Sequence, residues 1–251
     1  MARAWGTEQE RIRVDPSSPY DPIADLYDSW SRSVVEDVAF YLEEARAAGG
    51  PVVELGVGTG RIALPIARAG IPVVGVDSSE RMLEVCRRRA ARMGVEDCLD
   101  LRLGDLRHPP LDSTTSLVLC PFRSYLHLPT DADRRTALEA ARRLLEPGGR
   151  FVFDVFAPAP DDIAETNGRW LEREPEIYER ADWDANARSF TLRVRGPAAE
   201  TAMELAWTSP EEWRRLLEET GFEVLACYGW FDRRPYEGGE DTIWVSRRPP
   251  A

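Results

Sequence analysis

Three glycines at alternate positions, Gly56, Gly58 and Gly60, lie between a short apolar run and a stretch with helical spacing. A strand that ends in a glycine loop and leads into a helix leaves free backbone N–H groups at the carboxyl edge of a parallel sheet, where α/β proteins bind ligands. Glycine lets a ligand approach the backbone closely because it has no Cβ. The loop therefore predicts a small-molecule site, and the alternative is a set of tight turns without a ligand.

The spacing of this loop separates the ligands that such loops bind. A dinucleotide fingerprint reads G-x-G-x-x-G, but Arg61 stands where its third glycine would be. A P-loop requires a lysine, and the chain contains none, which also removes Schiff-base chemistry. From Glu54 to Gly60 the chain instead reads E-x-G-x-G-x-G.

An acidic residue, Asp77, ends the next apolar run in the sequence VVGVDSS. A carboxylate at the end of a second parallel strand can accept hydrogen bonds from both hydroxyls of a ribose. Proteins that bind dinucleotides and proteins that bind other nucleosides both use such an acid, so Asp77 indicates a ribose without identifying the ligand. The alternative is that Asp77 only caps the following helix.

The elements that must position these residues alternate along the chain. Short apolar strands are predicted at 51–55, 71–77, 99–105, 115–122 and 150–158, with helices at 20–48, 61–70, 78–94, 131–149 and 209–221 and a final strand pair at 222–231 and 242–248. Strand–helix alternation is typical of a parallel sheet covered on both sides. We predict an α/β, Rossmann-like fold with a mostly parallel seven-stranded sheet and helices on both faces.

Residues 169–207 have a different pattern, with period-two stretches and the turn Asp184–Ala187. Consecutive strands joined by turns are antiparallel, so we predict a small inserted antiparallel sheet. The chain is accordingly divided into a flexible N-terminal arm (1–19), a main ligand-binding domain (20–165 and 208–251) and the inserted sheet (166–207), which is expected to cap the substrate.

Five segments together resemble the class I S-adenosylmethionine-dependent methyltransferases. They are the glycine motif, Asp77, LGDLR at 103–107, CPFRSYLHL at 120–128 and ARRLLEPGGRFVFDVF at 141–156. The strands that follow the fifth sheet strand make the layout similar to the sugar amine N-methyltransferases. The resemblance covers about residues 20–156 and 209–247, and it implies S-adenosylmethionine as the cofactor.

The resemblance also implies roles for individual residues. Glu54 either ties down the loop amides or touches the ligand, Asp105 lies beside the adenine with Leu106 against the ring, and Tyr27 joins Tyr20 in a lid over the pocket. The alternatives are that Asp105 is a solvated turn residue and that both tyrosines only pack against the sheet. The cofactor-binding residues implied are Tyr27, Glu54, Gly56, Gly58, Gly60, Asp77, Ser78, Met82, Gly104, Asp105, Leu106, Cys120 and Phe122.

Three residues after the fourth strand are candidates for catalysis, because the family places the methyl acceptor there. His127 is a candidate base at neutral pH, or else a hydrogen-bonded structural histidine. Arg123 can hold a carboxylate of the acceptor through a bidentate pair, and Tyr125 lies in the same stretch. We expect transfer of a methyl group to an amine or hydroxyl of a small molecule by in-line displacement. The alternatives are a nicotinamide-dependent oxidoreductase and a non-catalytic S-adenosylmethionine-binding protein.

The amino-acid composition limits which binding partners and which cellular compartment we expect. The net charge of −12 argues against nucleic acid, whose phosphates require a basic face. There is no apolar run long enough for a membrane span, and no cluster of metal-ligand residues. Four cysteines without CxxC spacing are typical of reduced thiols in a cytoplasmic protein. A monomer and a homodimer are both compatible with the sequence.

Overall fold

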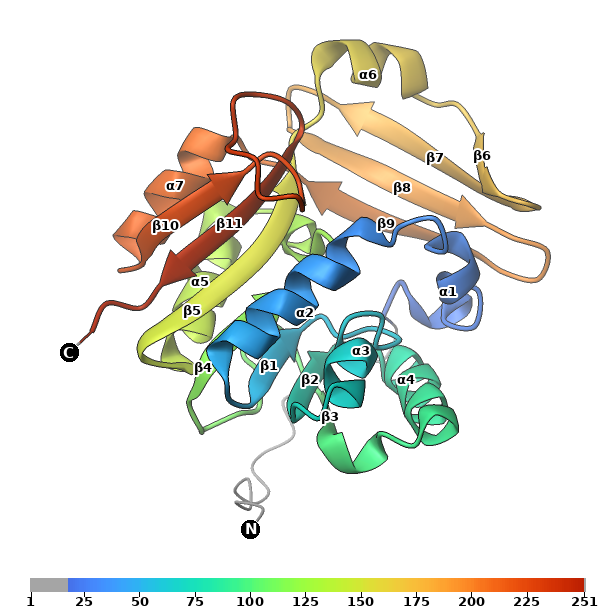
Figure 1. Ribbon diagram of the computed structural model, residues 1–251. Helices are drawn as coiled ribbons and strands as arrows, with labels where there is room; N and C mark the ends of the chain where they lie inside the picture. Colours follow the sequence, from blue (N-terminus) through green and yellow to red (C-terminus); the bar gives the residue numbers. More distant parts are fainter. Residues whose placement is uncertain (1–17, 251) are drawn as a thin grey trace.

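The strands and helices form one seven-stranded sheet with an inserted second sheet in the computed structural model, which describes residues 18–250 (Figure 1). The predicted flexible arm, 1–19, lies outside the described residues except for Ser18 and Pro19. The strands of the large sheet are β1 (Val52–Leu55), β2 (Val73–Asp77), β3 (Leu99–Leu103), β4 (Thr115–Cys120), β5 (Leu145–Phe156), β10 (Glu223–Tyr228) and β11 (Asp241–Arg247).

The order of these strands is β10-β11-β5-β4-β1-β2-β3. The five strands from β5 to β3 pair in parallel, whereas β11 is antiparallel to both β5 and β10. The chain proceeds outward from β1 in one direction to β2 and β3 and in the other to β4 and β5. The carboxyl ends of β1 and β4 therefore mark the topological switch point, where open α/β sheets bind ligands.

Helices cover both faces of the sheet, as predicted. Successive strand residues point to opposite faces, so Val52 of β1 packs in the cluster that includes α2 (Glu36–Ala48), α3 (Ala63–Arg68) and α4 (Glu80–Met93). The next residue, Val53, packs in the cluster that includes α5 (Asp131–Arg143) and α7 (Pro210–Glu219). The continuous apolar strands of the sequence thus correspond to a sheet that is buried on both sides.

The prediction of one helical stretch over 20–48 is wrong. The structure has a 3-10 turn η1 (Asp21–Ile23), a short helix α1 (Tyr27–Trp30) and then α2. Ser31 ends α1 by donating its hydroxyl to the Tyr27 carbonyl over 3.0 Å. Short hydroxyl side chains compete with the helix backbone in this way, and the β-branched residues 34 and 35 are poor helix formers. Further short helices are η2 (Glu96–Cys98), η3 (Ser124–His127) and α6 (Pro160–Thr166).

The inserted segment forms an antiparallel sheet of four strands, β6 (Leu171–Glu174), β7 (Ile177–Asp184), β8 (Ser189–Arg195) and β9 (Glu200–Ala206). The predicted turn separates β7 from β8, where Asp184 accepts hydrogen bonds from the amides of Asn186 and Ala187. Figure 1 shows this second sheet beyond the end of β5, on the side of the molecule where α1 lies. The sheet is thus placed near the N-terminal segment.

Two glycines with nearly the same φ angle test the packing behind the glycine loop. Gly60 (φ +83°) has room for no side chain, since a Cβ there would lie 2.6 Å from Cys86 Sγ and 2.9 Å from Leu64 Cγ, whereas at Gly70 (φ +81°) it would meet nothing within 4 Å. We expect Gly70→Ala to cost about 1 kcal/mol of unfolding free energy through backbone strain alone. Gly60→Ala is expected to cost about 1–3 kcal/mol more through overpacking.

Urea unfolding of the two variants beside the unsubstituted protein measures both costs. Gly70→Ala is the matched control because it carries the same left-handed strain. Equal costs at the two positions would contradict the close packing of the loop.

Candidate cofactor site

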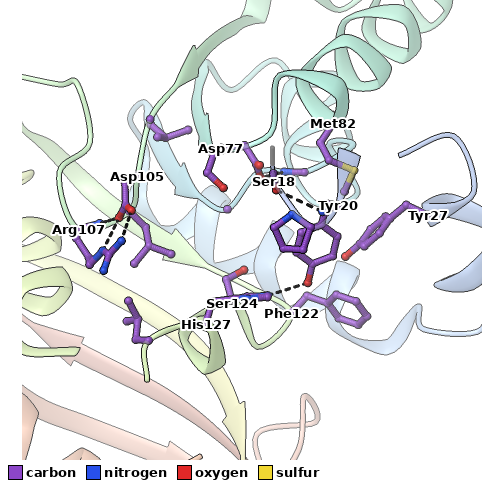
Figure 2. Close-up of a pocket in the computed structure, with 18 residues that line it drawn as sticks. Ser18, Tyr20, Tyr27, Asp77, Met82, Asp105, Arg107, Phe122, Ser124 and His127 are labelled. Carbon is purple, nitrogen blue, oxygen red and sulfur yellow. Dashed lines mark hydrogen bonds and ion pairs between the residues drawn. The ribbon is translucent and has the colours of Figure 1, made fainter. Parts of the chain in front are cut away.

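A cavity opens at the carboxyl ends of β1, β2, β3 and β4, at the switch point of the sheet (Figure 2). Its walls come from the N-terminal segment, the glycine loop, the ends of β2 and β3, and the segment after β4. The lining residues are Ser18, Pro19, Tyr20, Tyr27, Gly56, Gly58, Val76, Asp77, Ser78, Met82, Gly104, Asp105, Leu106, Arg107, Phe122, Ser124, His127 and Leu128.

The glycine loop folds back on β2. The amides of Gly56 and Val57 both donate to the carbonyl of Val76, over 2.8 and 3.0 Å. Gly56 has φ +74°, and a Cβ on it would lie 2.6 Å from Ser124 Oγ. The loop therefore fits between β2 and the segment after β4 because residue 56 has no side chain.

Asp77 is held by backbone amides on both sides of its carboxylate. Oδ2 accepts from Gly58 N and Oδ1 from Ser79 N, each over 2.8 Å. Ser79 itself caps α4 by accepting from Met82 N, so capping that helix does not need Asp77. Each carboxylate oxygen has a second accepting direction, and the side chain lines the cavity. Asp77 can therefore accept hydroxyl groups of a ligand while it keeps the loop in place.

Burial raises the pKa of Asp77 to about 6, because desolvation outweighs the backbone hydrogen bonds that favour its charged form. Glu54, on β1 beneath the loop, is 1% exposed, and its Oε2 has no hydrogen-bond partner. Burial also raises the pKa of Glu54 well above its usual range, although nearby Arg61 opposes this shift. Glu54 does not line the cavity, but it adds unused acceptor capacity directly behind the glycine loop.

The N-terminal segment covers the cavity with aromatic rings. Tyr20 Oη lies 2.8 Å from His127 Nε2, and the Tyr20 ring meets the ring of Tyr27 edge-on at 5.8 Å. Tyr27 in turn meets the ring of Phe122 edge-on at 6.4 Å. Figure 2 shows these four side chains grouped on one side of the cavity, opposite Asp105 and Arg107.

Hydrogen bonds hold this segment to the glycine loop and to α4. Ser79 Oγ donates to Asp21 over 2.5 Å, which ties η1 to the start of α4. Asp28 accepts from Thr59 Oγ1 in the glycine loop over 2.6 Å and from Arg89 of α4 over 2.8 Å. The N-terminal segment is therefore docked on the glycine loop and on α4.

Burial lowers the pKa of His127 to about 4. The imidazole is consequently neutral near pH 7, and one ring nitrogen is free to act as an acceptor. With such a pKa, His127 can bond to the Tyr20 hydroxyl but holds an abstracted proton weakly.

Most of the predicted cofactor-binding residues line the cavity, but three do not. Glu54 lies beneath the loop, and Gly60 packs against Cys86 on the far side. Cys120 is completely buried in the core at the end of β4. Glu54, Gly60 and Cys120 therefore do not belong to the lining of this cavity.

Two of the three candidate catalytic residues also lie outside the cavity lining. Tyr125 has no exposed surface and stacks on Trp213 with ring centroids 5.8 Å apart. Arg123 forms an ion pair with Asp241 over 2.6 Å, and its guanidinium lies 4.4 Å from the ring centroid of Phe156. Of the three candidate catalytic residues, only His127 therefore lines the cavity.

Asp105 lines the cavity, but its oxygens are already hydrogen-bonded. Oδ1 accepts from Arg107 N and Nε over 2.7 and 3.0 Å, and Oδ2 accepts from Arg107 Nη2 over 2.6 Å. These bonds lower the pKa of Asp105 despite partial burial. Arg107 was not predicted as a site residue, although it stands two residues after an acid at a strand end.

Ser18, Pro19, Val76, Ser124 and Leu128 also line the cavity and were not predicted as site residues, although Ser124 and Leu128 belong to the segment CPFRSYLHL at 120–128. Within residues 18–250, no group of three or more histidine, cysteine, aspartate or glutamate side chains could hold a metal ion. No helix in this part of the chain is long and apolar enough to cross a membrane.

A glycine loop at the switch point and an acid at the end of β2 define a nucleoside-binding α/β protein. Comparison with known proteins identifies the family within this class. Residues 52–149 match the family described as "Methyltransferase domain". Methyltransferase GfsG from Streptomyces halstedii is 31% identical over 209 residues, which cover 76% of this chain and 72% of that protein.

Solved structures are similar over nearly the whole length. The CcbJ methyltransferase from Streptomyces caelestis superposes with a TM-score of 0.83 at 29% identity, covering 94% of this chain and 99% of that one. The S-adenosylmethionine-bound structure of CalS10, an amino pentose methyltransferase from Micromonospora echinaspora, has the same fold, with a TM-score of 0.64 at 21% identity and coverage of 97% and 100%.

The chain belongs to the class I S-adenosylmethionine-dependent methyltransferases, and S-adenosylmethionine is its cofactor. The alternative of a nicotinamide-dependent oxidoreductase is therefore wrong. The residues present fit this cofactor. Asp77 presents free acceptor directions to the cavity, and Gly56 and Gly58 place no Cβ between the backbone and a ligand.

The pKa of Asp77 gives the cofactor affinity a pH dependence. Hydroxyl donors favour the ionised carboxylate, so protonation competes with binding, and the affinity for S-adenosylmethionine should fall as the pH drops below about 6. Below the midpoint, the loss of affinity approaches about tenfold for each pH unit. Isothermal titration calorimetry at several pH values between about 5 and 8, a range that includes the midpoint, measures this change in affinity.

Asp77→Asn is the control for this titration, since burial also raises the pKa of Asp154 to about 6. The variant should bind S-adenosylmethionine more weakly than the unsubstituted protein at neutral pH. Its affinity should no longer change with a midpoint near pH 6. An unaltered midpoint in Asp77→Asn would assign the titration to another group.

Proposed function

We propose that the protein transfers a methyl group from S-adenosylmethionine to a small molecule, and that the acceptor is an amine in preference to a hydroxyl. The observation that carries this proposal is the Tyr20–His127 pair, which lines the cofactor cavity beside Phe122. When bound, the cofactor supplies a methyl group already activated on a sulfonium. The chain then has to position the acceptor and exclude water.

The preference for an amine follows from the state of His127. A neutral amine attacks through its lone pair and loses its proton afterwards, so it requires no base in the transition state. A hydroxyl acceptor gains from a base whose pKa lies near the working pH, whereas burial lowers the pKa of His127 to about 4. We infer that His127 orients the Tyr20 hydroxyl, which can hydrogen-bond to the acceptor, and does not itself take the proton.

We infer that the N-terminal segment excludes water from the cavity. Tyr20 and Tyr27 cover the cavity, and their lid is docked through Asp21 and Asp28 onto α4 and the glycine loop. Such a lid has to open when the cofactor enters, which is the usual behaviour of enzymes that sequester their substrate.

We propose that the inserted sheet, residues 166–207, caps the acceptor. Two contacts between the sheet and the lid support this role. Thr201 Oγ1 donates to the Pro19 carbonyl over 2.5 Å, and Trp30 Nε1 donates to Glu179 over 3.1 Å. Side chains of the sheet can therefore reach an acceptor that lies next to the lid.

We further infer a cytoplasmic enzyme that acts as a monomer or homodimer on a small molecule, without nucleic acid as a partner. All four cysteines are unpaired thiols in the structure, which agrees with a reducing compartment. The net charge of −12 disfavours a polyanionic partner.

Methyl transfer is tested by incubating the protein with S-adenosylmethionine and a panel of primary amines, secondary amines and hydroxylated compounds. The expected result is formation of S-adenosylhomocysteine together with a gain of one methyl group in the mass of an amine. Transfer to hydroxyl compounds alone would contradict the amine assignment. Cofactor binding without transfer to any member of the panel would favour the non-catalytic alternative.

The role of His127 is tested by His127→Gln with the best acceptor of that panel. An orienting histidine predicts a loss in kcat of less than about tenfold, whereas loss of a general base predicts about 10²–10⁴-fold. His108→Gln is the matched control, because the other histidine is exposed and does not line the cavity. A loss of a hundredfold or more, restored at high pH, would assign the base to His127.

A further inference from the structure

A buried carboxylate outside the cavity organises the segment that follows β4. Asp154, on β5, is 5% exposed. Its Oδ1 accepts from Tyr41 Oη over 2.5 Å and from Phe122 N over 2.8 Å, and its Oδ2 accepts from Arg123 N over 3.1 Å. A single side chain thus receives two consecutive backbone amides of the cavity wall.

Those two residues have an unfavourable backbone conformation. Phe122 has φ +56° and Arg123 has φ +61°, so both are left-handed although neither is glycine. L-residues avoid this region because Cβ approaches the backbone. Successive amides in such a turn point together and form an anion-binding concavity, which the Asp154 carboxylate fills. The carboxylate therefore compensates the conformation that the turn requires.

The turn determines what faces the cofactor cavity. Phe122 lines it, with the Arg61 guanidinium 4.4 Å from its ring centroid and the Tyr27 ring at its edge. Ser124 follows and lies against Gly56, where no Cβ would fit. With ordinary negative φ values at 122 and 123, the same chain could not place both side chains against the lid and the glycine loop.

We propose that Asp154 is a positioning residue, which holds Phe122 and Arg123 in the left-handed conformation and thereby presents the Phe122 ring and Ser124 to bound S-adenosylmethionine. The inference rests on the cofactor assignment but not on the identity of the acceptor. Asp154 touches neither the cavity nor, on this account, the ligand. Its effect reaches the cofactor through the backbone of the turn.

The test uses Asp154→Asn, which keeps the side-chain volume but replaces one acceptor oxygen by an amide that cannot accept. We expect calorimetry to show S-adenosylmethionine binding weakened by about tenfold, the loss associated with one charge-assisted hydrogen bond. Tyr41→Phe is the matched control, since it removes the third donor and leaves both backbone contacts. Tyr41→Phe should bind the cofactor nearly as well as the unsubstituted protein.

A second pair of variants separates the turn from general stability. In the Asp154→Asn background, Arg123→Gly relieves the left-handed strain, whereas Arg123→Ala does not. Both remove the same ion pair with Asp241. Recovery of cofactor affinity by Gly and not by Ala is the expected result, and a crystal structure of Asp154→Asn should show residues 122–123 displaced from left-handed φ values.

Equal affinities of the Gly and Ala double variants, or an unchanged turn with unchanged affinity in Asp154→Asn, would overturn the assignment. The unsubstituted protein is titrated first. If that protein itself binds no S-adenosylmethionine, the proposed function fails, and the crystallographic φ values still test the role of Asp154 in the turn.

Discussion

The return of the glycine loop onto β2 is the constraint on which the rest of the site depends. Gly56 and Val57 share one carbonyl, that of Val76, and Gly58 donates to the carboxylate of Asp77. Because the loop has no side chains at its turning points, the segment after β4 can lie directly against it. The cofactor cavity is the space left at the carboxyl ends of the strands when backbone, rather than side chains, forms that wall.

Two aspartates on strands of the large sheet, Asp77 on β2 and Asp154 on β5, perform related tasks. Asp77 and Asp154 each accept two backbone amides, and burial raises the pKa of each to about 6. They differ in what else they meet. Asp154 accepts a third hydrogen bond, from Tyr41, and lies outside the cavity lining, whereas Asp77 lines the cavity. The same chemistry that fixes a turn in one place leaves acceptors for a ligand in the other.

The fold was predictable because local signals and burial agree. Apolar strands alternating with helices predicted the parallel sheet, and the helix predicted at 209–221 is present as α7, which begins with a capping box of Ser209 and Glu212. The site was only partly predictable. Motifs mark strand ends, so Gly56, Gly58 and Asp77 were found, but contacts between distant segments leave no local pattern. The Tyr20–His127 bond joins residues 107 positions apart, and the left-handed turn at Phe122 depends on a carboxylate from another strand.

A crystal structure of the protein with S-adenosylhomocysteine tests the central claim most directly. We expect both ribose hydroxyls to donate to Asp77 and the amino-acid end of the ligand to lie along Gly56 and Gly58, beneath Tyr20 and Tyr27. A nucleoside bound elsewhere, with Asp77 contacting only the amides of Gly58 and Ser79, would contradict it.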